Sequence, residues 1–146
     1  RPESLDTIVA TNLHADVLSD LAAALAGSLG IAPTANLDPE RRYPSMFEPI
    51  HGAYSKATDK GIANPIASIL SATMLLDHFG LLEEAALVRK GIDKSLKLHI
   101  TTPDLNTKYD NISTSKVGDF IEDFINNPDE TNLNFKNIHL GQSTII

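Results

Sequence analysis

The sequence predicts an α/β protein that is rich in helix and has few strands of its own. Three segments in the second half of the chain have the apolar spacing of helices, whereas only two or three short runs have the composition of strands. With 146 residues, 42% of them hydrophobic, the chain has the size and apolar content of one ordinary core. Strongly apolar helices pack against a sheet, so we expect some strands of that sheet to lie outside this sequence.

The first predicted elements are a short strand over 7–12 and an apolar helix that starts close to Asp16. Glycine and proline then end the helical pattern, so a domain boundary is expected near Gly27. Two extended segments are predicted next, at 31–37 and 46–50, separated by a polar, proline-containing surface loop.

The second half of the chain predicts three helices. The first is expected over 64–78, because Asn64 can accept a backbone N–H bond and Pro65 needs no such bond at the first helical position. It is apolar over more than half of its circumference, which indicates a helix buried between two layers. The other two are expected over 82–98 and from residue 113 or 114 to 125. Between them, Asp104 is expected to cap a turn.

Composition and charge exclude several classes of function. Twelve basic and nineteen acidic side chains give a net charge of −7, and no run of Lys or Arg forms a stripe for phosphates, so nucleic acid is not expected as a partner. The absence of cysteine excludes disulfides, thiol nucleophiles and thiolate-bound zinc. The longest apolar run, at 66–76, is interrupted by hydroxyl residues and is too short to cross a bilayer, so no membrane partner is expected.

Asp16 and Asp20 form the most informative pair of charged residues. Four residues apart in a helix, their side chains lie about 40° apart around its axis. The opposite side of the helix is apolar and carries Val17, Leu18, Leu21, Ala22 and Leu25. Mg²⁺ and Mn²⁺ prefer carboxylate oxygens and keep positions open for a chelating substrate. The pair is therefore either half of a metal site or a solvated acidic face.

Four motifs occur in a characteristic order. They are VATNLHADVLSD at 9–20, GIAPTAN at 30–36, FEPIHG at 47–52 and KGIANP at 60–65. In this order they resemble the C-terminal part of the metal-dependent β-decarboxylating dehydrogenases, the family of isopropylmalate, isocitrate, tartrate and D-malate dehydrogenases. The likeness covers about residues 1–125 and is greatest to the tartrate and D-malate branch, through RPE at 1–3 and NLDPER at 36–41.

The resemblance implies the two-domain fold of isopropylmalate and isocitrate dehydrogenases. Residues 1–27 would end the second domain, which carries the metal site, and residues 28–126 would form the C-terminal part of the first, cofactor-binding domain. Residues 127–146 are expected to form a polar, loosely docked tail. The family assembles the sheet of its first domain from N-terminal and C-terminal stretches, which accounts for the shortage of strands here. The helix after Asp16 would form the interface of a homodimer.

The resemblance also implies a reaction. Mg²⁺ or Mn²⁺ held by Asp16 and Asp20 would bind a 2-hydroxy acid of the tartrate, D-malate or 3-isopropylmalate type. Hydride passes to the nicotinamide, and the resulting keto acid loses its β-carboxylate as CO₂, with the metal as Lewis acid. The family's catalytic tyrosine and lysine lie upstream of such a segment, so no catalytic residue is expected in this chain, which alone should show little or no turnover. A cytoplasmic enzyme is expected.

For the cofactor, the resemblance implies NAD contacts from His51, Gly52 and Asn64 at the adenine and ribose, with Glu48 nearer the nicotinamide. Lys56 stands where NAD-using relatives have an acid. A lysine attracts a 2′-phosphate that a carboxylate repels, so this position favours NADP relative to NAD. Asp59 offers a substitute for the missing acid, and both cofactors stay open.

Three kinds of protein fit these observations, in descending order. The first is the C-terminal portion of an active homodimeric dehydrogenase. The second is a non-catalytic fragment or paralogue that binds nucleotide or pairs with a full-length relative. The third is an α/β interaction module in which Asp16 and Asp20 are surface charges.

Overall fold

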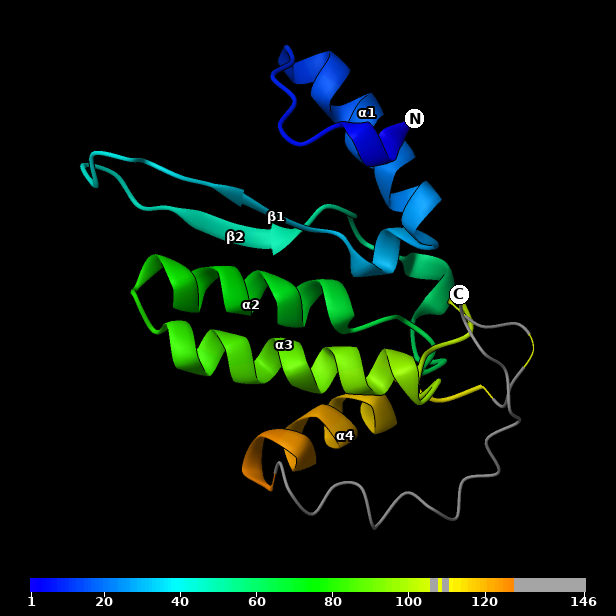
Figure 1. Cartoon of the computed structure of the whole chain (residues 1–146). Helices are drawn as coiled ribbons and strands as arrows, with labels where there is room; N and C mark the ends of the chain where they lie inside the picture. Colours follow the sequence, from blue (N-terminus) through cyan, green and yellow to red (C-terminus); the bar gives the residue numbers. More distant parts are fainter. Residues whose placement is uncertain (106–107, 109–110, 128–146) are drawn as a thin grey trace.

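The computed structural model describes residues 1–105, 108 and 111–127 (Figure 1). Four α-helices and two strands make up the described fold: α1 (Asn12–Ala26), β1 (Pro33–Asn36), β2 (Met46–Pro49), α2 (Ile66–His78), α3 (Leu82–Lys97) and α4 (Thr114–Asn126). Three short 3₁₀ helices join them: η1 (Pro2–Ser4), η2 (Leu29–Ile31) and η3 (Ser55–Ala57). The expected tail at 127–146 lies, apart from Asn127, outside the described residues.

The hairpin and three of the helices are stacked in layers (Figure 1). β1 and β2 pair antiparallel, and α2 packs against this hairpin on one side and against α3 on the other, with α4 beyond α3. The prediction of a helix-rich α/β chain whose α2 is buried between layers is confirmed. No described helix is both long enough and apolar enough to span a bilayer.

The helix ends follow local signals in the sequence. Asn64 Oδ1 accepts a hydrogen bond of 2.9 Å from the backbone N–H of Ile66, the first residue of α2. Gly80 adopts a φ of +79°, a left-handed conformation that glycine tolerates without strain, and it separates α2 from α3. The Ser113 hydroxyl accepts from the N–H of Lys116 and caps α4. All three predicted helices are confirmed.

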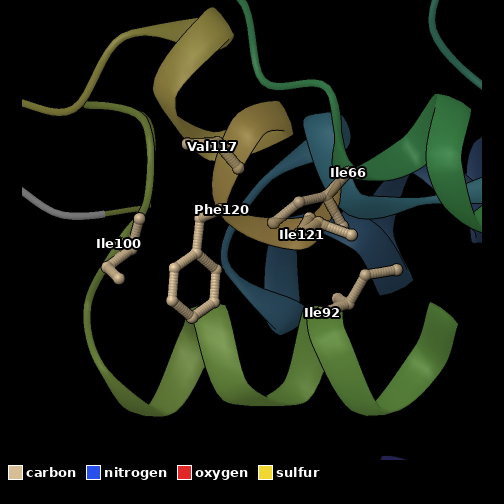
Figure 2. Packing of buried hydrophobic residues seen from close by; sticks show 6 residues of the cluster. All are labelled: Ile66, Ile92, Ile100, Val117, Phe120 and Ile121. Carbon is tan, nitrogen blue, oxygen red and sulfur yellow. The ribbon is translucent and has the colours of Figure 1, made fainter. Parts of the chain in front are cut away.

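The core lies where α2, α3 and α4 meet (Figure 2). Its fully enclosed apolar side chains are Ile66, Ile92, Ile100, Val117, Phe120 and Ile121. Gly91 allows α4 to approach α3 closely, because a Cβ there would lie 3.2 Å from Phe124 Cδ1. Arg89 on α3 also donates two hydrogen bonds to the Asp77 carboxylate at the end of α2, and this lowers the pKa of Asp77.

The loop between β1 and β2 is organised by one carboxylate. Asp38 accepts hydrogen bonds from the backbone N–H groups of Tyr43, Glu40 and Arg42, at 2.9, 3.1 and 2.7 Å. These donors favour the charged carboxylate, so the pKa of Asp38 lies below its usual value, with the Tyr43 N–H as the main cause. The hairpin turn is thus held by a local side chain rather than by the two short strands alone.

The strand predicted over 7–12 is wrong. Residues 7–11 form no strand, and α1 begins at Asn12 rather than close to Asp16, with Thr11 as its N-cap. Val9 is 95% exposed. A β-like composition produces a strand only where a neighbouring strand supplies hydrogen bonds and packing, and the described part of the chain provides none here.

α1 stands apart from the layered body (Figure 1). Only Ala23 in this helix is buried. Its large apolar side chains Leu13, Val17, Leu21 and Leu25 are between 55% and 71% exposed. Within the described residues, nothing covers the apolar face that the sequence predicts for this helix.

Candidate functional site

A cavity of about 340 Å³ lies where three parts of the chain meet. Its walls are residues 28–30 after α1, residues 51–54 after β2, residues 62–64 before α2, and Asp104. These segments are far apart in the sequence, so the cavity exists only once the hairpin and α2 have packed together.

The cavity brings together three of the predicted cofactor residues: His51, Gly52 and Asn64. His51 Nδ1 lies 3.0 Å from the carbonyl oxygen of Gly52, and because a carbonyl only accepts, we assign the proton to Nδ1. His51 Nε2 is then an acceptor, and it is buried without a hydrogen-bond partner among the described groups. A buried acceptor left unpaired costs free energy, so this atom favours a donor from a ligand or a water molecule.

Both polar atoms of the Asn64 amide are engaged. Oδ1 accepts from the N–H of Ile66, and Nδ2 donates to Asp104 Oδ2 at 2.9 Å. The amide therefore cannot flip without losing both bonds, and the side chain is fixed at the edge of the cavity. One N–H of Nδ2 is still available to a ligand.

Sequence reasoning missed the part that Asp104 plays in this cavity. The expected turn role has a counterpart in the structure, since the Thr102 hydroxyl donates to Asp104 Oδ1 at 2.6 Å. The other oxygen, however, accepts from Ser28 and Asn64, which lie 76 and 40 residues away. No local pattern signals contacts at such separations, and only the packed fold reveals them.

Two other predicted cofactor residues lie outside the cavity wall. Glu48 is exposed on β2, opposite Thr34 of β1. Lys56 is exposed in η3, two residues beyond Tyr54, which does line the cavity. Asp59, the alternative acid, is exposed nearby with a φ of +59°.

The predicted metal ligands Asp16 and Asp20 are exposed on α1 and do not line the cavity. At 1.5 Å per residue, Asp16 lies roughly 15 Å along the helix axis from the end of α1, where the cavity wall begins. In residues 1–105, 108 and 111–127, no group of three or more His, Asp or Glu side chains could hold a metal ion. The pair thus supplies two carboxylate donors, fewer than a six-coordinate ion needs.

The chain matches the family model for isocitrate/isopropylmalate dehydrogenase over residues 1–121. It is 61% identical over 105 residues to a probable tartrate dehydrogenase/decarboxylase, TtuC', of Agrobacterium vitis, an alignment that covers 72% of this chain and 29% of that protein. It is 51% identical over 104 residues to the 3-isopropylmalate dehydrogenase of Archaeoglobus fulgidus, covering 71% of this chain and 31% of that protein.

Solved structures agree with these matches. Isocitrate dehydrogenase from Methylococcus capsulatus superimposes with a TM-score of 0.76 at 34% identity, covering 84% of this chain and 35% of that one. A β-decarboxylating dehydrogenase from Thermococcus kodakarensis gives a TM-score of 0.67 at 40% identity, with 79% and 32% covered. The chain spans about a third of the length of these relatives. It belongs to the isocitrate/isopropylmalate dehydrogenase family, whose members are decarboxylating dehydrogenases.

Proposed function

We propose that this chain is the C-terminal portion of an NAD(P)-dependent, Mg²⁺- or Mn²⁺-dependent enzyme that oxidises a 2-hydroxy acid with β-decarboxylation. The observation that carries the proposal is the shared cavity of His51, Gly52 and Asn64, in a chain whose relatives include probable tartrate dehydrogenases/decarboxylases. Tartrate, D-malate and 3-isopropylmalate are the substrate types under consideration. In this proposal residues 1–27 belong to the second domain and 28–126 to the first.

The cavity suits the adenosine end of the cofactor. Leu29, Ile62 and the Tyr54 ring give it apolar walls for a base, and His51 Nε2 is an acceptor for a ribose hydroxyl. Glu48 and Lys56 lie outside this wall, so their roles would be at the parts of the nucleotide that extend beyond it.

Asp16 and Asp20 fit a metal ion as a half-site. Two carboxylates one turn apart can bind one hard cation, and the other ligands would come from residues outside this chain. When bound, such a metal stabilises negative charge on the substrate oxygen during hydride transfer and decarboxylation. The exposed apolar face of α1 supports the homodimer, because a second copy would remove it from water.

A non-catalytic nucleotide-binding or dimerising partner is the alternative. It is favoured by one observation: the cavity and the exposed face of α1 both occur within a chain that covers 29% of a relative's length. Both proposals expect little or no turnover by the purified chain. Robust oxidation of tartrate or D-malate by it would contradict that expectation.

Replacing Lys56 by aspartate is expected to shift the preference between nucleotides towards NADH by about tenfold, because the carboxylate accepts from a 2′-hydroxyl and repels a 2′-phosphate. Titration of NADH and NADPH into both chains, followed by nucleotide fluorescence, gives the two dissociation constants. Lys60→Asp is the matched control, since it makes the same charge change in the same loop. If neither affinity responds to Lys56→Asp, this residue has no part in cofactor choice.

Mn²⁺ is expected to bind weakly at the acidic pair, because this chain offers only two donors there. Paramagnetic broadening detects such binding at low occupancy, so the amide NMR signals of residues 14–22 should broaden first during a titration. The double variant Asp16→Asn, Asp20→Asn should lose this broadening, while Asp119→Asn on α4 should keep it. Equal broadening in all three chains would rule out the proposed half-site.

A further inference from the structure

A single carboxylate joins three of the segments that form the cavity. Asp104 Oδ2 accepts hydrogen bonds from the Ser28 hydroxyl and from Asn64 Nδ2, the latter at 2.9 Å. Asp104 Oδ1 accepts from the Thr102 hydroxyl at 2.6 Å. The segment after α1, the start of α2 and the loop after α3 therefore share one acceptor group.

Two of these partners also hold the backbone around them. The Ser28 hydroxyl accepts from the N–H of Gly30 at 2.9 Å and so caps η2, while it donates to Asp104. The Asn64 amide caps α2 through Ile66 in the same way, while it donates to Asp104. Each side chain is oriented from both sides, so the position of the carboxylate fixes the backbone at two places in the cavity wall.

The segments around Asp104 are also in close contact. A Cβ on Gly30 would lie 2.6 Å from Asn64 Cβ and 3.0 Å from Asp104 Oδ2. Real Cβ atoms do not approach other heavy atoms as closely as 2.6 Å, so only glycine fits there without displacing a neighbour. The bonds to Asp104 thus form in a junction with no spare room, where loss of the acceptor cannot be made good by a neighbouring side chain moving in.

We propose that Asp104 is a positioning residue for the nucleotide cavity: its carboxylate holds Asn64 and the segment 28–30 in the geometry that receives the ligand. This inference rests on the proposed function, because it takes the ligand to be a nicotinamide nucleotide. Since residues 28–30 directly follow α1, the same carboxylate also fixes where that helix leaves the layered body. Asp104 acts through Ser28 and Asn64, not through the reacting atoms.

The chemistry of the contacts distinguishes positioning from a requirement for charge. An asparagine at 104 can place its amide oxygen at the Oδ2 position and still accept from Ser28 and Asn64. Its NH₂ group then faces the Thr102 hydroxyl, which can rotate and accept. Asp104→Asn should therefore preserve most of the function, whereas Asp104→Ala removes all three bonds.

The test measures two properties of the whole chain, well below its melting temperature. The first is the dissociation constant for NADH, and the second is the hydrogen exchange of peptides that cover residues 27–31, followed by mass spectrometry. Asp104→Ala is expected to weaken NADH binding about tenfold and to speed exchange in that segment. Asp104→Asn should stay within about threefold of wild type, and Asp119→Ala, the control on α4, should change neither property.

Three results would be decisive against or for the proposal. Wild-type binding and exchange in Asp104→Ala would overturn it, as would an Asp104→Asn variant as impaired as Asp104→Ala, which would indicate a need for charge. If Asp104→Ala fails to fold, Ser28→Ala removes one donor and should show a smaller loss in both measurements, with unchanged values overturning the proposal. If wild type binds neither NADH nor NADPH, the proposed function fails, and the exchange comparison alone upholds or overturns the role of Asp104.

Discussion

Replacing Phe120 by alanine is expected to destabilise the chain by about 3–5 kcal/mol, a large part of the 5–15 kcal/mol typical of a folded domain. Phe120 is 0% exposed and lies at the centre of the cluster formed by α2, α3 and α4 (Figure 2). Truncation removes the transfer free energy of the ring and leaves a cavity, because helices packed on both sides can collapse only in part.

The measurement is urea-induced unfolding followed by circular dichroism. The midpoint should fall sharply in Phe120→Ala, with the slope of the transition little changed. Phe79→Ala is the matched control: the same atoms are removed from a side chain that is 68% exposed at the end of α2. A similar loss in both variants would mean that the cluster around Phe120 does not dominate the stability of the chain.

Replacing Gly30 by alanine is expected to cost about 1–3 kcal/mol of stability and to weaken nucleotide binding about tenfold. The new methyl group would lie 2.6 Å from Asn64 Cβ, an atom close to the backbone that cannot swing aside like the end of a long side chain. Either residues 28–30 or the start of α2 must therefore move. Both form walls of the cavity, so its shape changes with them.

Gly52→Ala is the control for this variant. Gly52 lines the same cavity, but a Cβ there would meet no heavy atom within 4 Å. Its stability in thermal unfolding should stay close to that of wild type, while Gly30→Ala should melt at a lower temperature. Equal melting temperatures for the two variants would show that the junction around Gly30 is able to relax.

The sequence was most informative where the signal is local. Asn64, Gly80 and Ser113 mark helix ends by conformational preferences and hydrogen bonds that involve only neighbours in the chain, and the helices near them are confirmed. The strand expected over 7–12 failed for the opposite reason. A strand depends on a partner elsewhere in the chain, and the residues alone cannot show whether that partner is present.

The same distinction applies to the candidate site. His51, Gly52 and Asn64 belong to two neighbouring motifs, and the structure places them around one cavity. Asp104 and Ser28 reach that cavity only because α2, α3 and the loop after α3 pack together, and nothing near them in the sequence indicates it. Glu48 and Lys56 lie outside the wall, and their predicted contacts stay predictions.

The hairpin of β1 and β2 has a consequence for handling this protein in the laboratory. Each strand has only one neighbour among the described residues, so its outer margin exposes backbone donors and acceptors with no ladder to join. Such margins recruit strands from other molecules, which makes the purified chain prone to aggregate as its concentration rises. Co-expression with the remaining two thirds of a related dehydrogenase would offer them an intended partner, and a rise in yield would be the sign of complementation.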